Sequence, residues 1–336
     1  TQVAGYESLN WKDCYEKAAY YAGIIMGRNP DVSYGTYRLL SFDELWKKSG
    51  FDESEHMFSV RTRSADEEYG NGVHQWYCGM QDAGGVLQKG PWVGNRFHWY
   101  CLFDNEDYRI TKGVKHRFQY DSQVKNGRGY YYPGTPEYKL MATGKNMDDV
   151  KVQEPVAPFN DGLTYTNSIS SNCLAFTTKY ADVTDPTIGR TDAYWPFLRY
   201  ADIVLIYAEA QCELNDGISQ DAIDALNDIR IRSNAKEASV TGDGAIETKV
   251  ELRSVIFEER AKELAYEGDR RWDLLRWGIY LDVMNSLGGI NEDGTRTPYD
   301  EGSINKRREF RHLLYPLPSL EVSTNMAIDK NNPGWN

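Results

Sequence analysis

The side chains best suited to bind a ligand are aromatic rings that gather between positions 75 and 100, interleaved with amide and guanidinium groups. The rings are Trp76, Tyr77, Trp92, Phe97, His98, Trp99 and Tyr100, and the polar groups are Gln75, Gln81, Asn95 and Arg96. A sugar ring stacks its apolar C–H face on Trp or Tyr, while its hydroxyls form hydrogen bonds with planar polar groups. These residue types therefore favour a carbohydrate site.

The predicted ligand-binding residues are a subset of this cluster. They are Trp76, Tyr77, Trp92, Arg96, His98 and Trp99. The chain holds 24 Tyr and 9 Trp, more than a core of its size needs, so some rings should face solvent or ligand. Any single ring has a structural alternative, which is packing within a region that has few regular elements. We expect at least one of Trp76, Trp92 and Trp99 to contact ligand.

A charged segment from residue 251 to 277 offers the kind of carboxylate pair that glycoside hydrolysis requires. Its acids, however, lie three or four residues from bases along a predicted helix, where opposite charges pair. The predicted pairs are Glu258/Lys262, Glu267/Arg271, Glu267/Arg270 and Asp273/Arg276. A carboxylate beside arginine has a lowered pKa and is a poor general acid. We therefore expect an ion-pair network without catalytic residues.

Other enzyme and cofactor chemistries lack their sequence signatures. The histidines, at 56, 74, 98, 116 and 312, show no metal-ligand spacing, and no Ser or Cys lies in a nucleophile-elbow motif. The five cysteines include no C-x-x-C pair. We expect no metal site, no cofactor and no enzymatic activity. The net charge of −12, without a basic stripe, argues against nucleic acid as a partner.

Helical hairpins are the elements that must position the aromatic cluster. In residues 199–214 apolar side chains recur at helical spacing, and residues 220–232 repeat the pattern with small alanines that allow close packing. Together they span 34 residues, the length of a tetratricopeptide unit. One unit cannot bury both of its faces, so further helices must pack beside it. Residues 11–27 predict one such helix and residues 41–48 a shorter one.

The segment from 61 to 195 differs from these helices. It is rich in glycine and shows little helical periodicity, while its dense aromatic residues argue against disorder. We expect ordered loops and short strands there, laid on a helical scaffold. The predicted fold class is mainly α. Its parts are a tetratricopeptide-like helical segment at 1–60, a loop-rich ligand-binding excursion at 61–195, and a tetratricopeptide-like unit, charged helix and extended C-terminal segment at 196–336.

Separated blocks of this sequence resemble the SusD/RagB family in content and order. They are Arg199–Asp202 with Ala208–Ala210, Asp228–Arg230, Glu258–Arg260, Glu267–Leu274, and Tyr315–Pro318 with Asn332–Trp335. Members of that family are nutrient-binding lipoproteins on the outer surface of Bacteroidetes-type bacteria, mostly for glycans. They cap a TonB-dependent transporter of the SusC type and have no catalytic activity. The resemblance covers most of this chain, but it starts in the middle of the length that is usual for the family. We therefore expect the family's N-terminal portion, with its lipid-bearing cysteine, to be absent from this chain.

The resemblance implies a glycan-binding protein of the outer membrane, exposed on the cell surface, that passes an oligo- or polysaccharide to a SusC-like TonB-dependent transporter. It also implies one SusD-like domain overall, held to the membrane only through a lipid anchor outside this chain. The longest apolar run, residues 203–208, is too short to cross a bilayer. Two alternatives stay open: a peptide-binding, RagB-like member of the same family, and a protein-interaction scaffold without a small ligand.

Overall fold

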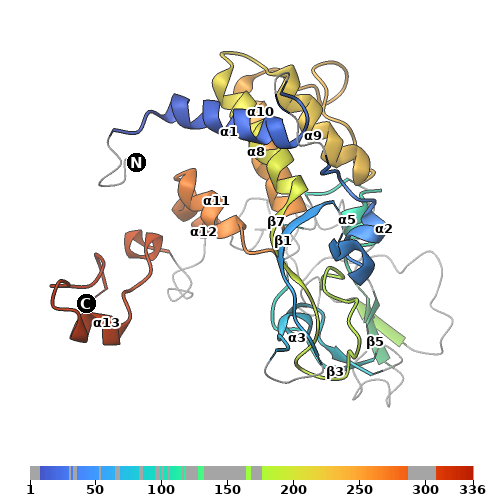
Figure 1. Cartoon of the computed structure of the whole chain (residues 1–336). Coiled ribbons are helices and arrows are strands. Elements are labelled where there is room, and N and C mark those ends of the chain that lie inside the picture. The colour runs from blue at the N-terminus through green and yellow to red at the C-terminus, as the bar shows by residue number, and fades with distance from the viewer. Residues whose placement is uncertain are drawn as a thin grey trace. The chain divides into compact units, whose positions relative to one another are not determined.

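The computed structural model describes most of the chain and is shown in Figure 1. The described residues are 8–29, 32, 36–52, 54–64, 69–82, 86–94, 99, 102–104, 106–115, 117–118, 128–131, 164–167, 176–286 and 308–335. They fall into two compact units, the first within residues 8–268 and the second from Asp269 onward. The first unit holds the aromatic cluster.

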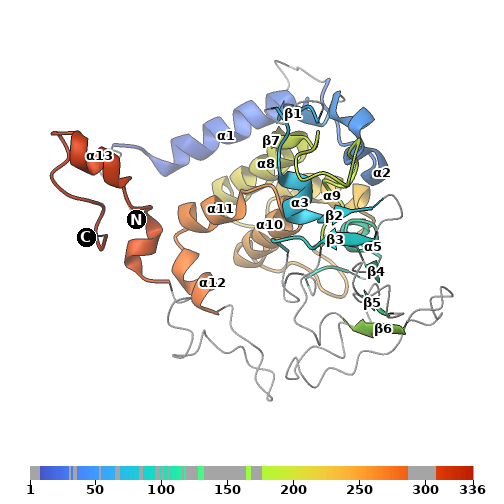
Figure 2. The same ribbon diagram turned by 90° about the horizontal axis from the view of Figure 1, so that it is seen from below.

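The scaffold of the first unit consists of α1 (Trp11–Ile25), α8 (Tyr200–Leu214), α9 (Gln220–Arg232) and α10 (Lys249–Glu263). Helix α8 contacts the other three, and α8, α9 and α10 lie side by side in Figures 1 and 2. Side-chain caps stabilise the N-termini of α9 and α10. Ser219 accepts from the Ala222 N–H at the start of α9, and Thr248 forms a capping box with Glu251 at the start of α10. The predicted hairpin at 199–232 is confirmed, and so is the N-terminal helix, which ends at Ile25.

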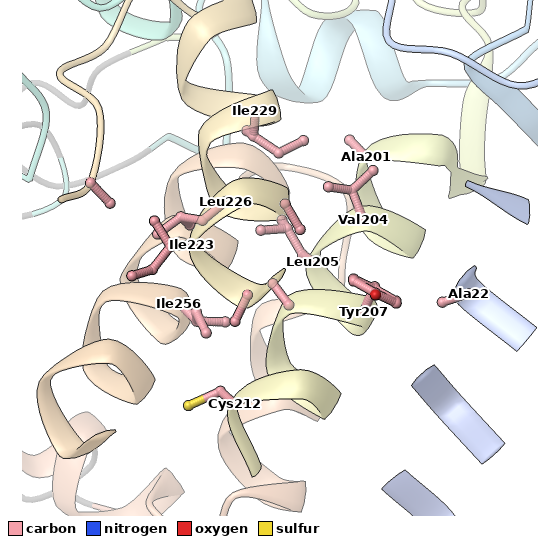
Figure 3. Packing of buried hydrophobic residues seen from close by; sticks show 14 of the residues in the cluster. Ala22, Ala201, Val204, Leu205, Tyr207, Cys212, Ile223, Leu226, Ile229 and Ile256 are labelled. Carbon is pink, nitrogen blue, oxygen red and sulfur yellow. The ribbon is translucent and has the colours of Figure 1, made fainter. Parts of the chain in front are cut away.

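An apolar core lies between these helices (Figure 3). Leu205 of α8, Leu226 and Ile229 of α9 and Ile256 of α10 are fully buried, and Cys212 packs in the same cluster. Burial of each large aliphatic side chain contributes about 1.5–3 kcal/mol relative to exposure. The helical periodicity of the sequence therefore marks the residues that hold the scaffold together.

Short strands and helices make up residues 42–60 and the described part of the loop-rich segment. Strand β1 (His56–Val60) pairs antiparallel with β7 (Trp195–Arg199), which leads directly into α8. A second antiparallel pair joins β2 (Met80–Gln81) to β3 (Leu87–Lys89). The third sheet contains β4 (Arg117–Phe118), β5 (Arg128–Tyr131) and β6 (Thr164–Asn167), with β5 and β6 parallel. The short helices are α2 (Phe42–Leu45), η1 (Lys48–Asp52), α3 (Val73–Tyr77) and α5 (Tyr108–Thr111).

The second unit contains α11 (Arg270–Arg276), α12 (Tyr280–Ser286), η4 (Phe310–Leu313) and α13 (Ser319–Thr324). Arg271 fastens it, because its guanidinium donates to the Tyr280 hydroxyl at 2.6 Å and to the His312 carbonyl at 2.9 Å. The Trp335 indole N–H donates to the Arg311 carbonyl at 2.8 Å. The predicted extended C-terminal segment thus carries a short helix, α13.

The prediction of one continuous helix over 251–277 is wrong, since α10 and α11 are separate helices. Tyr266 has φ +69° and Gly268 has φ +102°. Both values lie in the left-handed region, which interrupts a right-handed helix. Helical spacing therefore assigns the wrong partner to Glu267, which pairs with Arg199 and Lys179.

A buried network of ion pairs joins the loop-rich segment to the scaffold. Its members are Glu55, Asp107, Arg109, Lys179, Arg199, Arg230, Arg232, Glu259, Glu263 and Glu267. Arg199 is 1% exposed and donates to Glu55 and Glu267 at 2.6 Å each and to Glu263 at 3.1 Å. Two of the predicted pairs form, Glu258/Lys262 at 2.6 Å and Asp273/Arg276 at 2.9 Å, while the buried pairs of Arg199 join residues far apart in sequence.

The network keeps three of its acids, Glu259, Glu263 and Glu267, ionised. Burial alone would raise the pKa of Glu259, Glu263 and Glu267, but neighbouring Arg and Lys side chains hold each pKa below the ordinary value of 4.5. At His56 burial is the larger effect and lowers the pKa from 6.5 to about 4. The hydrogen bond to the Leu45 carbonyl acts in the opposite direction, because it raises the pKa. Both kinds of group make folding sensitive to acid.

We expect the melting temperature to fall on acidification in two stages. The His56 ring binds a proton more readily in the unfolded chain, so stability is lost as the pH falls from 6.5 toward about 4. The three carboxylates contribute fully above their unfolded pKa of about 4.5 and lose that contribution at lower pH. Thermal melts across this range test both stages. Burial lowers the pKa of His74 as well, so His56→Gln should reduce the first stage without removing it. A melting temperature that is constant down to about pH 4 would contradict the prediction.

Candidate ligand-binding site

Helix α3 carries Trp76 and is fixed at several points. The Asn71 side chain accepts from the Val73 N–H at 3.0 Å, next to the first turn. His74 is 1% exposed, and its Nδ1 lies 2.8 Å from the Tyr180 carbonyl. Burial lowers the pKa of His74, so its ring is neutral near pH 7. A helix of five residues is thus held by its neighbours, and Trp76 projects from a fixed backbone.

Trp76 and Trp92 lie next to each other. The backbone N–H groups of Trp92 and Val93 both donate to the Trp76 carbonyl at 2.9 Å. Both indoles face solvent, with 44% of Trp76 and 64% of Trp92 exposed. The Lys89 Nζ lies 5.3 Å from the Trp92 ring centroid. The structure therefore brings together two of the predicted binding residues at the surface, which is where a stacking ligand needs them.

A shallow pocket of about 600 Å³ opens beside Trp76. Its lining residues are Gly70, Asn71, Gly72, Gln75, Trp76, Gly189 and Arg190. The volume lies within the range of about 300–1,000 Å³ that is usual for small-molecule sites. Sequence reasoning missed Arg190, because it follows Trp76 by more than a hundred residues and no local pattern marks it. We call this the Trp76 pocket.

Glycines give the Trp76 pocket its floor. A Cβ added at Gly72 would lie 2.9 Å from the Trp76 ring, so the indole rests directly on the backbone. A Cβ at Gly189 would lie 2.7 Å from the Gln75 side-chain oxygen. Both distances are too short for a real side chain, and the ring and the amide keep their positions because these residues are glycine.

Two of the interleaved amides differ in their availability. Gln81 is engaged, since it accepts from Lys115 Nζ at 2.8 Å and donates to the Cys78 carbonyl at 3.3 Å. Within the described part of the chain, no hydrogen bond occupies the Gln75 side chain, which lines the pocket beside Trp76. Gln75 is therefore the amide placed to bind the hydroxyl groups of a ligand.

Tyr77 and Trp99 lie in a different environment. The Tyr77 ring contacts Tyr180, Trp195 and Tyr266, with centroids 5.4, 6.2 and 5.4 Å away. The Trp99 indole donates to the Ala261 carbonyl at 2.9 Å, and its ring meets Phe103 and Tyr266. Successive residues of a helix diverge by about 100°, so Trp76 points into the pocket while Tyr77 supports it from behind. Tyr77 and Trp99 are half-buried, and a direct contact between either ring and ligand stays a prediction.

The other predicted site residues, Arg96 and His98, lie outside the described residues, as do Asn95, Phe97 and Tyr100. No set of His, Cys, Asp or Glu side chains in the described ranges is arranged to hold a metal ion. Every helix in those ranges is too short or too polar to cross a bilayer. Glu259 and Glu263 of α10 are engaged with bases in the buried network. The described lining of the Trp76 pocket supplies an indole ring for stacking, amides and a guanidinium group.

The fold and pocket define a protein of the helical-repeat class with an aromatic surface site. The chain belongs to the SusD family, whose model matches residues 81–335. Two curated relatives are SusD-like proteins of Formosa agariphila. P2 is 33% identical over 142 residues, which is 41% of this chain and 25% of P2, and P38 is 36% identical over 142 residues, which is 40% of this chain and 25% of P38.

Solved structures share the fold at low sequence identity. A SusD superfamily protein from Parabacteroides distasonis has a TM-score of 0.63 and 19% identity, covering 99% of this chain and 60% of that one. The surface glycan-binding protein A from Bacteroides thetaiotaomicron, solved with laminarihexaose, has a TM-score of 0.55 and 18% identity, covering 96% and 60%. These similarities confirm the predicted mainly helical fold. The chain spans about 60% of the length of these structures.

Proposed function

We propose that this chain is the glycan-binding part of a cell-surface protein that captures an oligo- or polysaccharide. The exposed Trp76 ring carries the proposal, because it lies on a glycine floor with the unengaged Gln75 amide beside it. Such a site offers a flat apolar surface with one placed polar group, which fits a neutral sugar ring. Membership of the SusD family supports the same ligand class, as does the laminarihexaose complex of a structural relative.

In the proposed pathway the captured glycan passes to a SusC-like TonB-dependent transporter in the outer membrane. The protein would be a lipoprotein exposed on the outer surface, as is typical of the SusD family. The transfer step predicts that cells carrying Trp76→Ala take up less of the glycan than wild-type cells with equal amounts of surface protein. Equal uptake by both strains would contradict it.

One binding assay tests the ligand class. Calorimetric titration against a panel of polysaccharides and peptides, with laminarin included because a structural relative is described as binding it, should give saturable binding to a polysaccharide. Peptide binding alone would favour the RagB-like alternative, and binding to no member of the panel would contradict a small-ligand function.

We also expect the protein to leave its ligand intact. Glu259 and Glu263 of α10 are matched by bases, and no acidic side chain among the described residues lines the Trp76 pocket. Incubation with the bound polysaccharide should therefore create no new reducing ends. Steady release of sugar that disappears when the protein is heat-unfolded would show catalysis and contradict the binding function.

A further inference from the structure

A second pocket, of about 330 Å³, lies beside the first one and is lined by Arg61, Thr62, Arg63 and Tyr69. We call it the Tyr69 pocket. The Tyr69 side chain is 57% exposed, and the Arg63 guanidinium carbon lies 5.7 Å from its ring centroid. No hydrogen bond in the described ranges engages the Tyr69 hydroxyl. This pocket therefore repeats the elements of the Trp76 pocket, an exposed ring with polar groups beside it.

The two pockets are lined by residues that follow one another in the chain, since Tyr69 lines one and Gly70 the other. The Asn71 side-chain amide donates to the Thr62 hydroxyl at 3.1 Å, which joins a lining residue of each pocket. The Thr62 hydroxyl in turn donates to the Ala193 carbonyl at 3.0 Å, and Asn71 and Thr191 form a backbone bridge. The spacing of the two pockets is thus fixed by hydrogen bonds.

We propose that the Tyr69 pocket is a second subsite for the same glycan, so that the ligand is a chain long enough to cover both Trp76 and Tyr69. This inference rests on the proposed function. Once one sugar unit stacks on Trp76, contact with Tyr69 becomes an intramolecular step at high effective concentration. Units that reach the second ring add affinity without a second loss of translational freedom. The site selects for chain length.

Affinity measured against ligand length tests this inference. Oligosaccharides from the disaccharide to the hexasaccharide are titrated, with laminari-oligosaccharides as the first series and the glycan identified in the panel as the second. Wild-type affinity should rise with length. Tyr69→Ala should weaken hexasaccharide binding about tenfold and leave disaccharide binding unchanged, since a lost aromatic anchor costs on that order. Tyr69→Phe should retain the rise.

The controls separate this inference from the function on which it rests. Tyr21 of α1 is 63% exposed, and Tyr21→Ala should leave every affinity unchanged. If Tyr69→Ala lowers the melting temperature, Tyr69→Leu keeps apolar bulk without a flat ring and should still abolish the rise. The second subsite is overturned if the Tyr69 variants keep the full dependence on length, even while Trp76→Ala weakens binding to all lengths. If no oligosaccharide or polysaccharide binds the wild type, the proposed function fails as well.

Discussion

Replacing Arg199 with alanine is expected to lower the free energy of unfolding by about 3–5 kcal/mol, because it removes one cation from a buried network and leaves three buried carboxylates with fewer basic partners. Arg199 bonds Glu55, Glu263 and Glu267, and all three carboxylates are almost completely buried. Without the guanidinium, their negative charges would repel one another in a medium of low polarizability. Chemical denaturation monitored by circular dichroism measures the loss.

A matched variant isolates the effect of burial. Asp43 pairs with Lys112 at 2.7 Å, but its side chain is 71% exposed, so Asp43→Asn should cost under about 1 kcal/mol. Arg199→Lys keeps the positive charge and loses the forked geometry, and we expect an intermediate loss. If Arg199→Ala proved no more destabilising than Asp43→Asn, the network would contribute little to folding.

Trp76→Ala is expected to weaken glycan binding by about 1–3 kcal/mol, the range for a central aromatic anchor. Trp92→Ala should act in the same direction, because its backbone N–H donates to the Trp76 carbonyl and its side chain is more exposed. Stacking of an indole on a neutral sugar involves little screened charge, so the loss should be nearly independent of salt. Titrations of both variants at low and high ionic strength measure it.

Gly72→Ala provides a control that keeps the indole but displaces it. Its new Cβ would lie 2.9 Å from the Trp76 ring, so the ring must move from the glycine floor and binding should weaken. Trp11 is 60% exposed on α1, and Trp11→Ala should have no effect on affinity. A ligand whose affinity drops steeply with salt would indicate peptide capture by charge instead. Unchanged binding in both Trp76→Ala and Trp92→Ala would place the site elsewhere.

The scaffold was predictable because local spacing determines it. The apolar repeat in 199–214 and 220–232 reports which face of each helix is buried, and α8 and α9 form there. The break between α10 and α11 was not predictable in the same way. It depends on Tyr266 adopting a left-handed conformation that its residue type disfavours, and the Tyr180 hydroxyl donates to the Tyr266 carbonyl at 2.8 Å.

The candidate site was predictable only in part. Residue type and clustering predict Trp76 and Trp92 as binding residues, and both are exposed, but these patterns do not show which neighbouring rings pack inward. Tyr77 follows Trp76 directly and points to Tyr180 and Trp195 because of the helical turn between them. Arg190 reaches the pocket through tertiary folding, and a single sequence holds no signal for that contact.

The single carbonyl that joins Trp76 to Trp92 has an evolutionary consequence. Since the Trp92 and Val93 N–H groups both donate to that oxygen, the distance between the two ring positions is set by the main chain. Exchange of either indole for a phenol, an imidazole or an amide would leave this distance unchanged. Under the proposed function, point mutations at positions 76 and 92 would therefore change the sugar preference of this surface without remodelling of a loop.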